Sequence, residues 1–529
     1  MKKNLLLLFI LVNTSFVFAQ NELNPSDWKM TQAKLLFEDN KFKDALDIYL
    51  ELSNEYNTDA FLNFRISLCY FEEGKLDQSN EYCKKALDNC HDNNLKKEII
   101  YLQANIYHKQ ENFVSAKDCL NGIMSGTATV DSNQVKLLLK QINVAEELYK
   151  NPVNCNFVAI PVESEINSEF NEIFPVCSRR GNKLFFTSDR QIAADQERNA
   201  ITHNFPNSIF ESEIDQSSIE GLPVLVDETF ASGKNYILGS VSAADMIYFL
   251  YKETPENNDG GDLYTDTRDT DEDFTDPVKI ESVLNTKYYE YSPSYDCINA
   301  ILYYVSNFKD IDKTKSDIFK SELFKSRFPE PDMLKKTSYD NDQAFVYVHP
   351  GGGFMVFAMD GETSMGGYDL FICYDEDGKW SEPENMGYPV NTSSDEMQFC
   401  LSSDGLTAYI SSNRPLGAGG FDIYKFDFLS VIGNKTGLNS GLVNFYGQIT
   451  GDEGEFIQTE LEITDKNNKK NKQVISSDEY GYYSYTVKAG SIYNLEIKNK
   501  MYEEYSEEID ASDQGGKVFE KDIDLIIKP

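Results

Sequence analysis

Three glutamates share one sequence context in the central part of this 529-residue chain. Each stands five residues after an asparagine, and Ser or Thr follows that asparagine: Asn167 with Glu172, Asn285 with Glu290, and Asn391 with Glu396. Repeated carboxylates could line a central channel and bind a ligand, or they could accept hydrogen bonds from loop backbone. Because unsatisfied buried backbone groups are costly, we expect the structural role.

A second short pattern contains a small or polar residue, then Ile or Leu, then an aromatic residue. It occurs five times, beginning at Ser208, Asp262, Asp317, Asp369 and Asp422. The aromatic residues are 54, 55, 52 and 53 positions apart. Self-similarity at one fixed period indicates that one supersecondary unit is stacked repeatedly. We therefore assign the three glutamates and the four aspartates to the repeat structure.

Residues that could support catalysis or bind a metal are scattered. The four histidines, at positions 91, 108, 203 and 349, fall in different segments, and no Gly-x-Ser-x-Gly motif is present. The acidic run from Asp266 to Asp273 lacks the Gly and Glu positions of an EF-hand, so a solvated loop is predicted. From the sequence we expect no catalytic residue, no cofactor, no metal and no enzymatic activity.

Nine cysteines form no Cys-x-x-Cys motif, and their odd number leaves at least one thiol unpaired or intermolecular. Cys69, Cys83 and Cys119 stand at helical positions where a small apolar residue would pack. Disulfide pairing in an oxidising compartment stays open.

The repeat period of the central region predicts a β-propeller over residues 153–430. Before the aromatic pattern comes a strand that ends in a polar turn, as in residues 184–190, 301–307 and 408–414. An outer strand near a proline follows it, as at Pro277 and Pro383. The last copy lacks this outer strand, whereas an unassigned one at Phe157–Val162 precedes the first copy. We expect this segment to complete the last sheet and close five blades, with six as the alternative.

These repeats resemble the TolB-like propeller repeats of bacterial envelope proteins. The resemblance rests on GGYDLFIC at 366–373 and on SSDGLTAYISSNRPLGAGGFDIYKF at 402–426.

The N-terminal part of the chain has helical periodicity over residues 27–150. Asn40-x-Phe42-x-x-Ala45 is followed 34 residues later by Gly74-x-Leu76-x-x-Ser79, and a third copy, Phe113-x-x-Ala116, follows after 37 residues. Gly or Asn permits a left-handed turn, and the small residue lets two helices approach closely. Residues 20–150 resemble tetratricopeptide repeats, which implies a concave surface for protein partners. A helical spacer without a ligand is the alternative.

The C-terminal part, residues 443–529, changes to short strands with alternating apolar residues. Gly447-x-Ile449, Gly481-Tyr-Tyr and Gly490-x-x-Tyr493-x-Leu495 resemble the carboxypeptidase regulatory-like, transthyretin-type β-sandwich. Residues 431–442 are expected to form the linker before it.

The first 19 residues have the features of a secretory signal peptide, with Lys2 and Lys3, an apolar run, and Val17-Phe18-Ala19 before the cleavage point. The mature chain would then hold 47 basic and 87 acidic residues, a net charge of −40. Such a field disfavours nucleic acid and anionic lipid as partners. We expect an exported, periplasmic protein with no membrane span, peripherally associated with the outer membrane.

The order of helical repeats, TolB-like propeller and regulatory-like sandwich resembles a group of Bacteroidetes envelope proteins. That group is related to the outer membrane protein A family, and some members are accessory to type IX secretion. Many continue into a peptidoglycan-binding domain, whereas the printed sequence ends at Pro529, so cell-wall anchoring is not carried over. The resemblance implies a scaffold or adaptor that binds envelope proteins through its helices. The alternative is a propeller that binds glycans or peptides, which would expose aromatics such as Tyr288, Tyr289 and Tyr339 on one face.

Overall fold

The computed structural model describes residues 25–528 with internal gaps. The gaps are residues 40, 125–131, 161–163, 179–181, 194–195, 197, 199–203, 216–217, 220, 231–234, 242–246, 253–260, 268–273, 281–282, 297–299, 309–314, 324–326, 335–340, 350–352, 377–378, 403–404, 416, 433–441, 453, 469–471, 478–480 and 513–517. The chain divides into two compact units. The first comprises Met1–Lys150, Glu197–Asn204 and Gly361–Gly367, and the second comprises the remainder. The signal peptide predicted for residues 1–19 lies outside the described residues.

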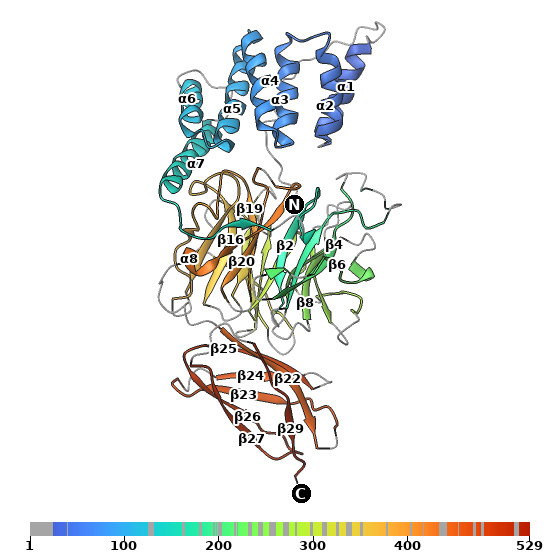
Figure 1. Ribbon diagram of the computed structural model, residues 1–529, viewed down its shortest axis with the longest axis vertical. Coiled ribbons are helices and arrows are strands. Elements are labelled where there is room, and N and C mark those ends of the chain that lie inside the picture. Colours follow the sequence, from blue (N-terminus) through green and yellow to red (C-terminus); the bar gives the residue numbers. More distant parts are fainter. Residues whose placement is uncertain are drawn as a thin grey trace. The chain divides into compact units, whose positions relative to one another are not determined.

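The first unit contains seven helices among its described residues, each packed against the next along the chain (Figure 1). They are α1 (Pro25–Glu38), α2 (Phe42–Ser53), α3 (Ala60–Glu72), α4 (Leu76–Asn89), α5 (Asn93–Lys109), α6 (Phe113–Met124) and α7 (Ser132–Lys150). The helical prediction for residues 27–150 is therefore confirmed wherever the chain is described. None of the described helices is both long enough and apolar enough to cross a membrane.

The small residues at the repeated positions lie where two helices touch. Ala45, Ser79 and Ala116 have no exposed surface. In the second pair, Ser67 Oγ of α3 donates to Ser79 O at 2.7 Å, and Ser79 Oγ donates to Ser67 O at 2.8 Å. A larger side chain at either position would separate the two backbones and break both hydrogen bonds.

The turns between paired helices use a left-handed residue, but only one of the two described examples is a glycine. Gly74 has a φ of 69° before α4, as its residue type predicts. Before α6 the left-handed residue is Glu111, with a φ of 61°. Asn40, the equivalent position before α2, is not described. The third turn therefore holds a side chain in a conformation that L-residues disfavour.

The central part of the second unit forms five small antiparallel sheets, a propeller-like arrangement (Figure 1). The first contains β2 (Glu172–Cys177), β3 (Lys183–Ser188), β4 (Ser208–Asp215), β5 (Ser218–Ile219) and β6 (Val224–Leu225). The second contains β7 (Tyr236–Val241), β8 (Ile247–Lys252), β9 (Asp262–Thr267) and β10 (Val278–Lys279). The third contains β11 (Glu290–Asp296), β12 (Ile301–Ser306), β13 (Asp317–Glu322) and β14 (Asp332–Met333). The fourth contains β15 (Asp342–Val348), β16 (Phe354–Asp360), β17 (Asp369–Tyr374) and β18 (Glu384–Asn385). The fifth contains β19 (Glu396–Leu401), β20 (Thr407–Ser412), β21 (Asp422–Asp427) and β1 (Val158–Ala159).

The fifth sheet takes its outer strand from the segment that precedes the first sheet. Val158 of β1 lies opposite Lys425 of β21, and Ala159 lies opposite Tyr424. Phe157 stacks on the Tyr424 ring at 5.6 Å between centroids. The predicted pairing of this segment is present, although residues 161–163 of it are not described. Instead of an outer strand, the short helix α8 (Phe428–Ile432) follows β21.

Each of the other four sheets ends in an outer strand of two residues that directly follows a proline. The prolines are Pro223, Pro277, Pro331 and Pro383, which precede β6, β10, β14 and β18. Proline has no backbone N–H to donate to a further strand, which suits an edge position. The sequence pattern was recognised at only two of these prolines.

The middle strands are buried on both faces rather than on alternate residues. In β3, β12 and β20 every residue after the first is buried. Each sheet contacts its neighbours along the chain through its first strand, and β2 of the first sheet also contacts β19 of the fifth. A strand between two other sheets needs apolar residues on both faces, so period-two alternation is lost.

The first strand of each sheet contains a β-bulge close to its start. The pairing register shifts after Ile173, Leu238, Tyr291, Gln343 and Glu396. Phe174 and Ser292 adopt φ values of 51° and 52° at two of these bulges. Bulges re-aim side chains and bend a strand.

The C-terminal part of the second unit contains two further sheets. One joins β22 (Leu442–Gly451), β25 (Tyr482–Lys488), β28 (Val518–Glu520) and β29 (Ile523–Leu525). The other joins β23 (Glu460–Asp465), β24 (Lys472–Ser476), β26 (Ile492–Ile497) and β27 (Tyr505–Asp510). Alternate residues of β23 and β26 are buried, and one apolar cluster holds side chains from both sheets. The period-two prediction is confirmed here, because each sheet has only one covered face.

Candidate functional site: the repeated acidic motifs

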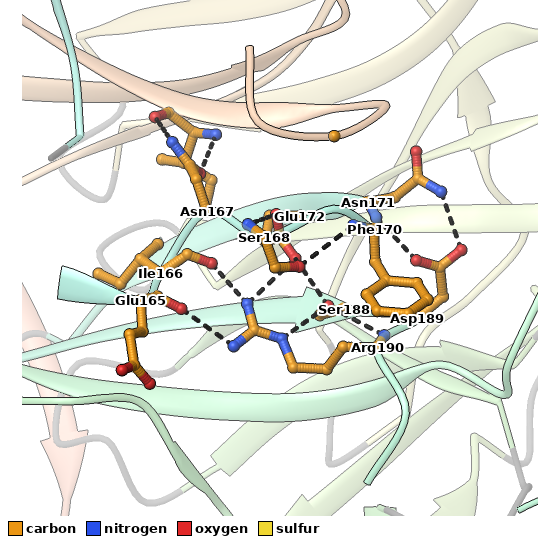
Figure 2. Close-up of polar contacts among 12 residues, drawn as sticks. Glu165, Ile166, Asn167, Ser168, Phe170, Asn171, Glu172, Ser188, Asp189 and Arg190 are labelled. Carbon is orange, nitrogen blue, oxygen red and sulfur yellow. Dashed lines mark hydrogen bonds and ion pairs between the residues drawn. The ribbon is translucent and has the colours of Figure 1, made fainter. Parts of the chain in front are cut away.

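Glu172, the first residue of β2, is fully buried and saturated with hydrogen-bond donors (Figure 2). Ser168 donates to it twice, from its backbone N at 2.8 Å and from its Oγ at 2.6 Å. Ser188 Oγ donates at 2.9 Å, and Arg190 Nη2 lies 3.0 Å from the same carboxylate oxygen. These contacts give the buried carboxylate the hydrogen-bond partners and the opposite charge that burial requires.

Arg190 connects this carboxylate to the preceding loop (Figure 2). Its Nη1 donates to Glu165 O at 3.0 Å, and its Nη2 donates to Ile166 O. The guanidinium carbon also lies 4.9 Å from the centre of the Phe210 ring in β4. One arginine therefore ties together a loop, a middle strand and a third strand.

The motif around Glu396 in the fifth sheet repeats this geometry. Thr392 donates from its N at 2.7 Å and from its Oγ1 at 2.9 Å, and Ser412 Oγ donates at 2.7 Å. Arg414 Nη2 lies 3.1 Å from Glu396 Oε1 and donates to Val390 O at 2.8 Å.

The motif around Glu290 in the third sheet lacks the arginine. Thr286 donates from its N at 3.0 Å and from its Oγ1 at 2.6 Å, and Ser306 Oγ donates at 3.1 Å. The residue two positions after that serine is Phe308, where the other two motifs have arginine. Burial raises the pKa of Glu290 to about 7, although the three hydrogen bonds oppose the shift.

The asparagine of each motif joins its own sheet to a neighbouring sheet. Asn167 Oδ1 accepts from Ile423 N at 2.7 Å, and its Nδ2 donates to Ile423 O at 2.9 Å. Asn285 makes the same pair of bonds with Leu263 of β9, and Asn391 makes it with Leu370 of β17. The side-chain amide thus acts as one extra backbone unit between sheets.

The fourth sheet makes this connection with a different residue. Asp342 occupies the place of the glutamate, since it begins β15 as Glu290 begins β11. Its Oδ1 accepts from Ser316 N at 2.8 Å. The next residue, Gln343, accepts from Ile318 N of β13 at 2.9 Å. Sequence analysis missed Gln343, because its amide comes from the strand itself and not from the preceding loop.

The four aspartates each begin the third strand of a sheet. Asp262 pairs with Lys279 at 2.7 Å, and Asp369 accepts from Asn385 Nδ2 at 2.6 Å. Asp422 accepts from Gly419 N at 3.3 Å, and burial raises the pKa of its carboxyl. Asp317 lies opposite Ser306 of the neighbouring strand. The seven predicted residues are therefore spread over five sheets and do not converge on one pocket.

Aromatic side chains from three different sheets meet around Phe174 of β2. The ring of Phe174 lies 5.5 Å from Tyr251 of the second sheet and 5.9 Å from Phe345 of the fourth. Phe174 and Phe345 are 1% and 3% exposed. The glutamates are fully buried behind donors, so their geometry favours the structural role over binding in an open channel.

The described residues contain no group of three or more His, Cys, Asp or Glu side chains placed to hold a metal ion. Of the acidic run, Asp266 is 2% exposed and accepts from Thr267 N and Thr275 Oγ1. Asp269, Asp271 and Asp273 lie outside the described residues. His108 is buried in α5, where desolvation lowers its pKa to about 4.

Comparisons with known proteins give no family-model match and no curated relative. Among solved structures, an α-L-arabinofuranosidase from Lactobacillus brevis is 16% identical, with 49% of this chain and 90% of that chain covered and a TM-score of 0.33. A GH43 β-xylosidase/α-arabinofuranosidase from a compost microbial metagenome is 10% identical, with 52% and 94% covered and a TM-score of 0.35. For the 3-chlorocatechol 1,2-dioxygenase from Rhodococcus opacus, the match spans 61% of that enzyme and 17% of this chain, at 12% identity and a TM-score of 0.14.

These neighbours correct one prediction from the sequence, namely that the protein is not an enzyme. Several of the similar structures are glycoside hydrolases, so the exclusion of enzymatic activity is contradicted and is withdrawn. The scattered histidines and the absent Gly-x-Ser-x-Gly motif argue only against hydrolases that use a Ser-His-Asp triad. They say nothing about enzymes whose catalytic groups are carboxylates. Identities of 10–16% transfer no catalytic residue to this chain.

Proposed function

We propose that the five central sheets form a closed five-bladed propeller and that the two C-terminal sheets form a transthyretin-type sandwich. Three observations support closure: the pairing of β21 with β1, whose segment precedes the first sheet in the chain, the two hydrogen bonds of Asn167 to Ile423, and the contact of β2 with β19. The apolar cluster shared by the C-terminal sheets supports the sandwich.

We further propose that the protein is a scaffold or adaptor of the cell envelope that binds other envelope proteins through its helices. Its place would be the periplasm, as an accessory of type IX secretion or of another outer-membrane assembly. The observation that carries the proposal is on α1. Trp28 and Leu35 are 61% and 56% exposed, and they lie two helical turns apart on one face. Two large apolar side chains exposed on one helix face can serve as the anchors of a protein interface.

The charge of the chain limits the partner. The formal net charge is −38, so a partner with apolar anchors and a basic rim would be attracted, whereas an acidic one would be repelled. A protein partner fits this better than nucleic acid or an anionic lipid surface.

The test is chemical crosslinking in native envelopes, followed by affinity capture and mass spectrometry. The double variant Trp28→Ser/Leu35→Ser should lose its crosslinked partners at least about 10-fold, because interface anchors contribute more than 1 kcal/mol each. Val114→Ser is the matched control, since Val114 is 67% exposed in helix α6 of the same unit. Unchanged recovery with the double variant, or equal loss with the control, would remove α1 as the binding face.

The alternative, a glycan- or peptide-binding propeller, gains no support from the tyrosines that would distinguish it. Tyr288 and Tyr289 are half-buried, with their rings against Phe308 and Tyr291. Tyr339 lies outside the described residues.

A further inference from the structure

Two cysteines that are far apart in the sequence meet at the junction of the first and fifth sheets. Cys177 is the last residue of β2, and Cys400 lies in β19. Their Sγ atoms are 3.5 Å apart although 223 positions separate the residues. Each is 3% exposed. From this geometry we propose that Cys177 and Cys400 form a disulfide in the oxidised protein.

The distance between the two sulfurs makes the bond accessible with little rearrangement. A disulfide has an S–S length of about 2.05 Å, so the two sulfurs must approach by about 1.5 Å. Rotation about the two Cα–Cβ bonds supplies a shift of this size. Both residues lie in strands, which already hold their backbones next to each other.

The bond would form by thiol–disulfide exchange with a small-molecule or protein disulfide, such as oxidised glutathione. One cysteine thiolate attacks the donor disulfide, forms a mixed disulfide and releases one donor thiol. The second thiolate then attacks the mixed disulfide at the protein sulfur and releases the other donor thiol. Two protein thiols and one donor disulfide become one protein disulfide and two donor thiols, so the donor takes up two electrons and two protons.

The disulfide would join the first and fifth sheets covalently. Without it, this junction is held by non-covalent contacts, among them those of β1 and Asn167. A crosslink that closes so long a segment removes many conformations from the unfolded chain. Because both sulfurs are buried, exchange must occur during folding or when the first and fifth sheets separate. This inference does not depend on the adaptor function, since it concerns the stability of the sheets alone.

The experiment starts from the full chain, purified in reductant and then equilibrated in mixtures of oxidised and reduced glutathione. After denaturation and alkylation, peptide mapping should recover a linked pair that contains Cys177 and Cys400. On non-reducing gels the oxidised chain should migrate faster, because its loop is closed. Reduction of the same chain should lower the melting temperature of the sheets by about 10 °C.

The control variant is Cys373→Ser, which changes another buried strand cysteine and should keep both the linked peptide and the fast band. Cys400→Ser should remove both. Comparison of the oxidised and reduced wild-type chain needs no mutation, so a variant that fails to fold does not decide the matter. Recovery of Cys177 and Cys400 as alkylated thiols from a natively folded chain in excess oxidised glutathione would overturn the proposal.

Discussion

The absence of an arginine next to Glu290 should make the stability of the sheets depend on pH near neutrality. The pKa of Glu290 rises from 4.5 to about 7 on burial in the fold. For an acid whose folded pKa is raised, the stabilising contribution is complete below pH 4.5. It is lost as the pH rises through 7, because the folded state must then hold a buried charge.

The size of the effect follows from the shift in pKa. One pKa unit corresponds to about 1.4 kcal/mol, so a shift of about 2.5 units costs about 3 kcal/mol above pH 8. Glu290 is fully buried, so solvent screening reduces this value little. The isosteric change Glu290→Gln keeps the acceptor oxygen but cannot ionise, so it should remove this part of the pH dependence.

A second variant, Phe308→Arg, should restore the missing partner. Its guanidinium would occupy the position that Arg190 and Arg414 have in the other two motifs, 3.0 and 3.1 Å from the carboxylate. The pKa of Glu290 should then fall toward its usual range, and the loss of stability between pH 5 and 8 should disappear. The aromatic rings that flank Phe308 provide the same platform that Phe210 provides for Arg190.

The assay is the urea midpoint of unfolding at pH 5, 6, 7 and 8 for the wild type and for each variant. The matched control is Arg190→Phe, which converts the first motif to the third and should introduce a new loss of stability above neutral pH. Differences between variants isolate the motif, because all other titrating groups are shared. If Glu290→Gln shows the same slope as the wild type, Glu290 does not titrate near pH 7 and the reasoning fails.

Two further predictions concern hydrogen bonds and turns. Asn167→Ala should lower the free energy of unfolding by about 1–3 kcal/mol, because the backbone N–H of Ile423 loses its buried acceptor. The control Asn89→Ala, in α4, should lower it by less than about 0.5 kcal/mol. Equal urea midpoints for the two variants would contradict the role of Asn167 in joining two sheets. Glu111→Gly should raise the stability of the helices by about 1 kcal/mol, because glycine adopts the left-handed conformation without strain. Gly74→Ala should lower it by about 1 kcal/mol for the converse reason. Nothing lies within 4 Å of a Cβ at position 74, so the backbone conformation alone would cause the loss. Thermal melts followed at 222 nm would test this pair, and a stabilised Gly74→Ala chain would refute the argument.

Local patterns were enough to locate the elements of this fold. The 34-residue step gave the paired helices, because a small residue such as Ser79 is needed wherever two helices touch. The period in the low fifties gave the sheets, since every copy ends in the same third strand. The outer strand at Val158 was also predictable, because one sheet lacked a strand and one strand lacked a sheet.

The repeat pattern in the sequence did not predict which residues of different sheets contact each other. Gln343 replaces the motif asparagine through a bulge in β15, and its register shift depends on the strand beside it. Gly239 illustrates the same limit, since a Cβ there would lie 2.4 Å from Pro293 O of the third sheet. The two residues are distant in sequence, so neither shows the constraint alone.

The sequence by itself determined the repeat, its period and the residues that begin each strand, because these depend on interactions within one supersecondary unit. Only the tertiary structure decided which strands are buried on both faces, that Asn167 bonds to Ile423, and that Cys177 lies beside Cys400. The two contacts join residues that are more than 200 positions apart in the chain, and local periodicity carries no information about such pairs.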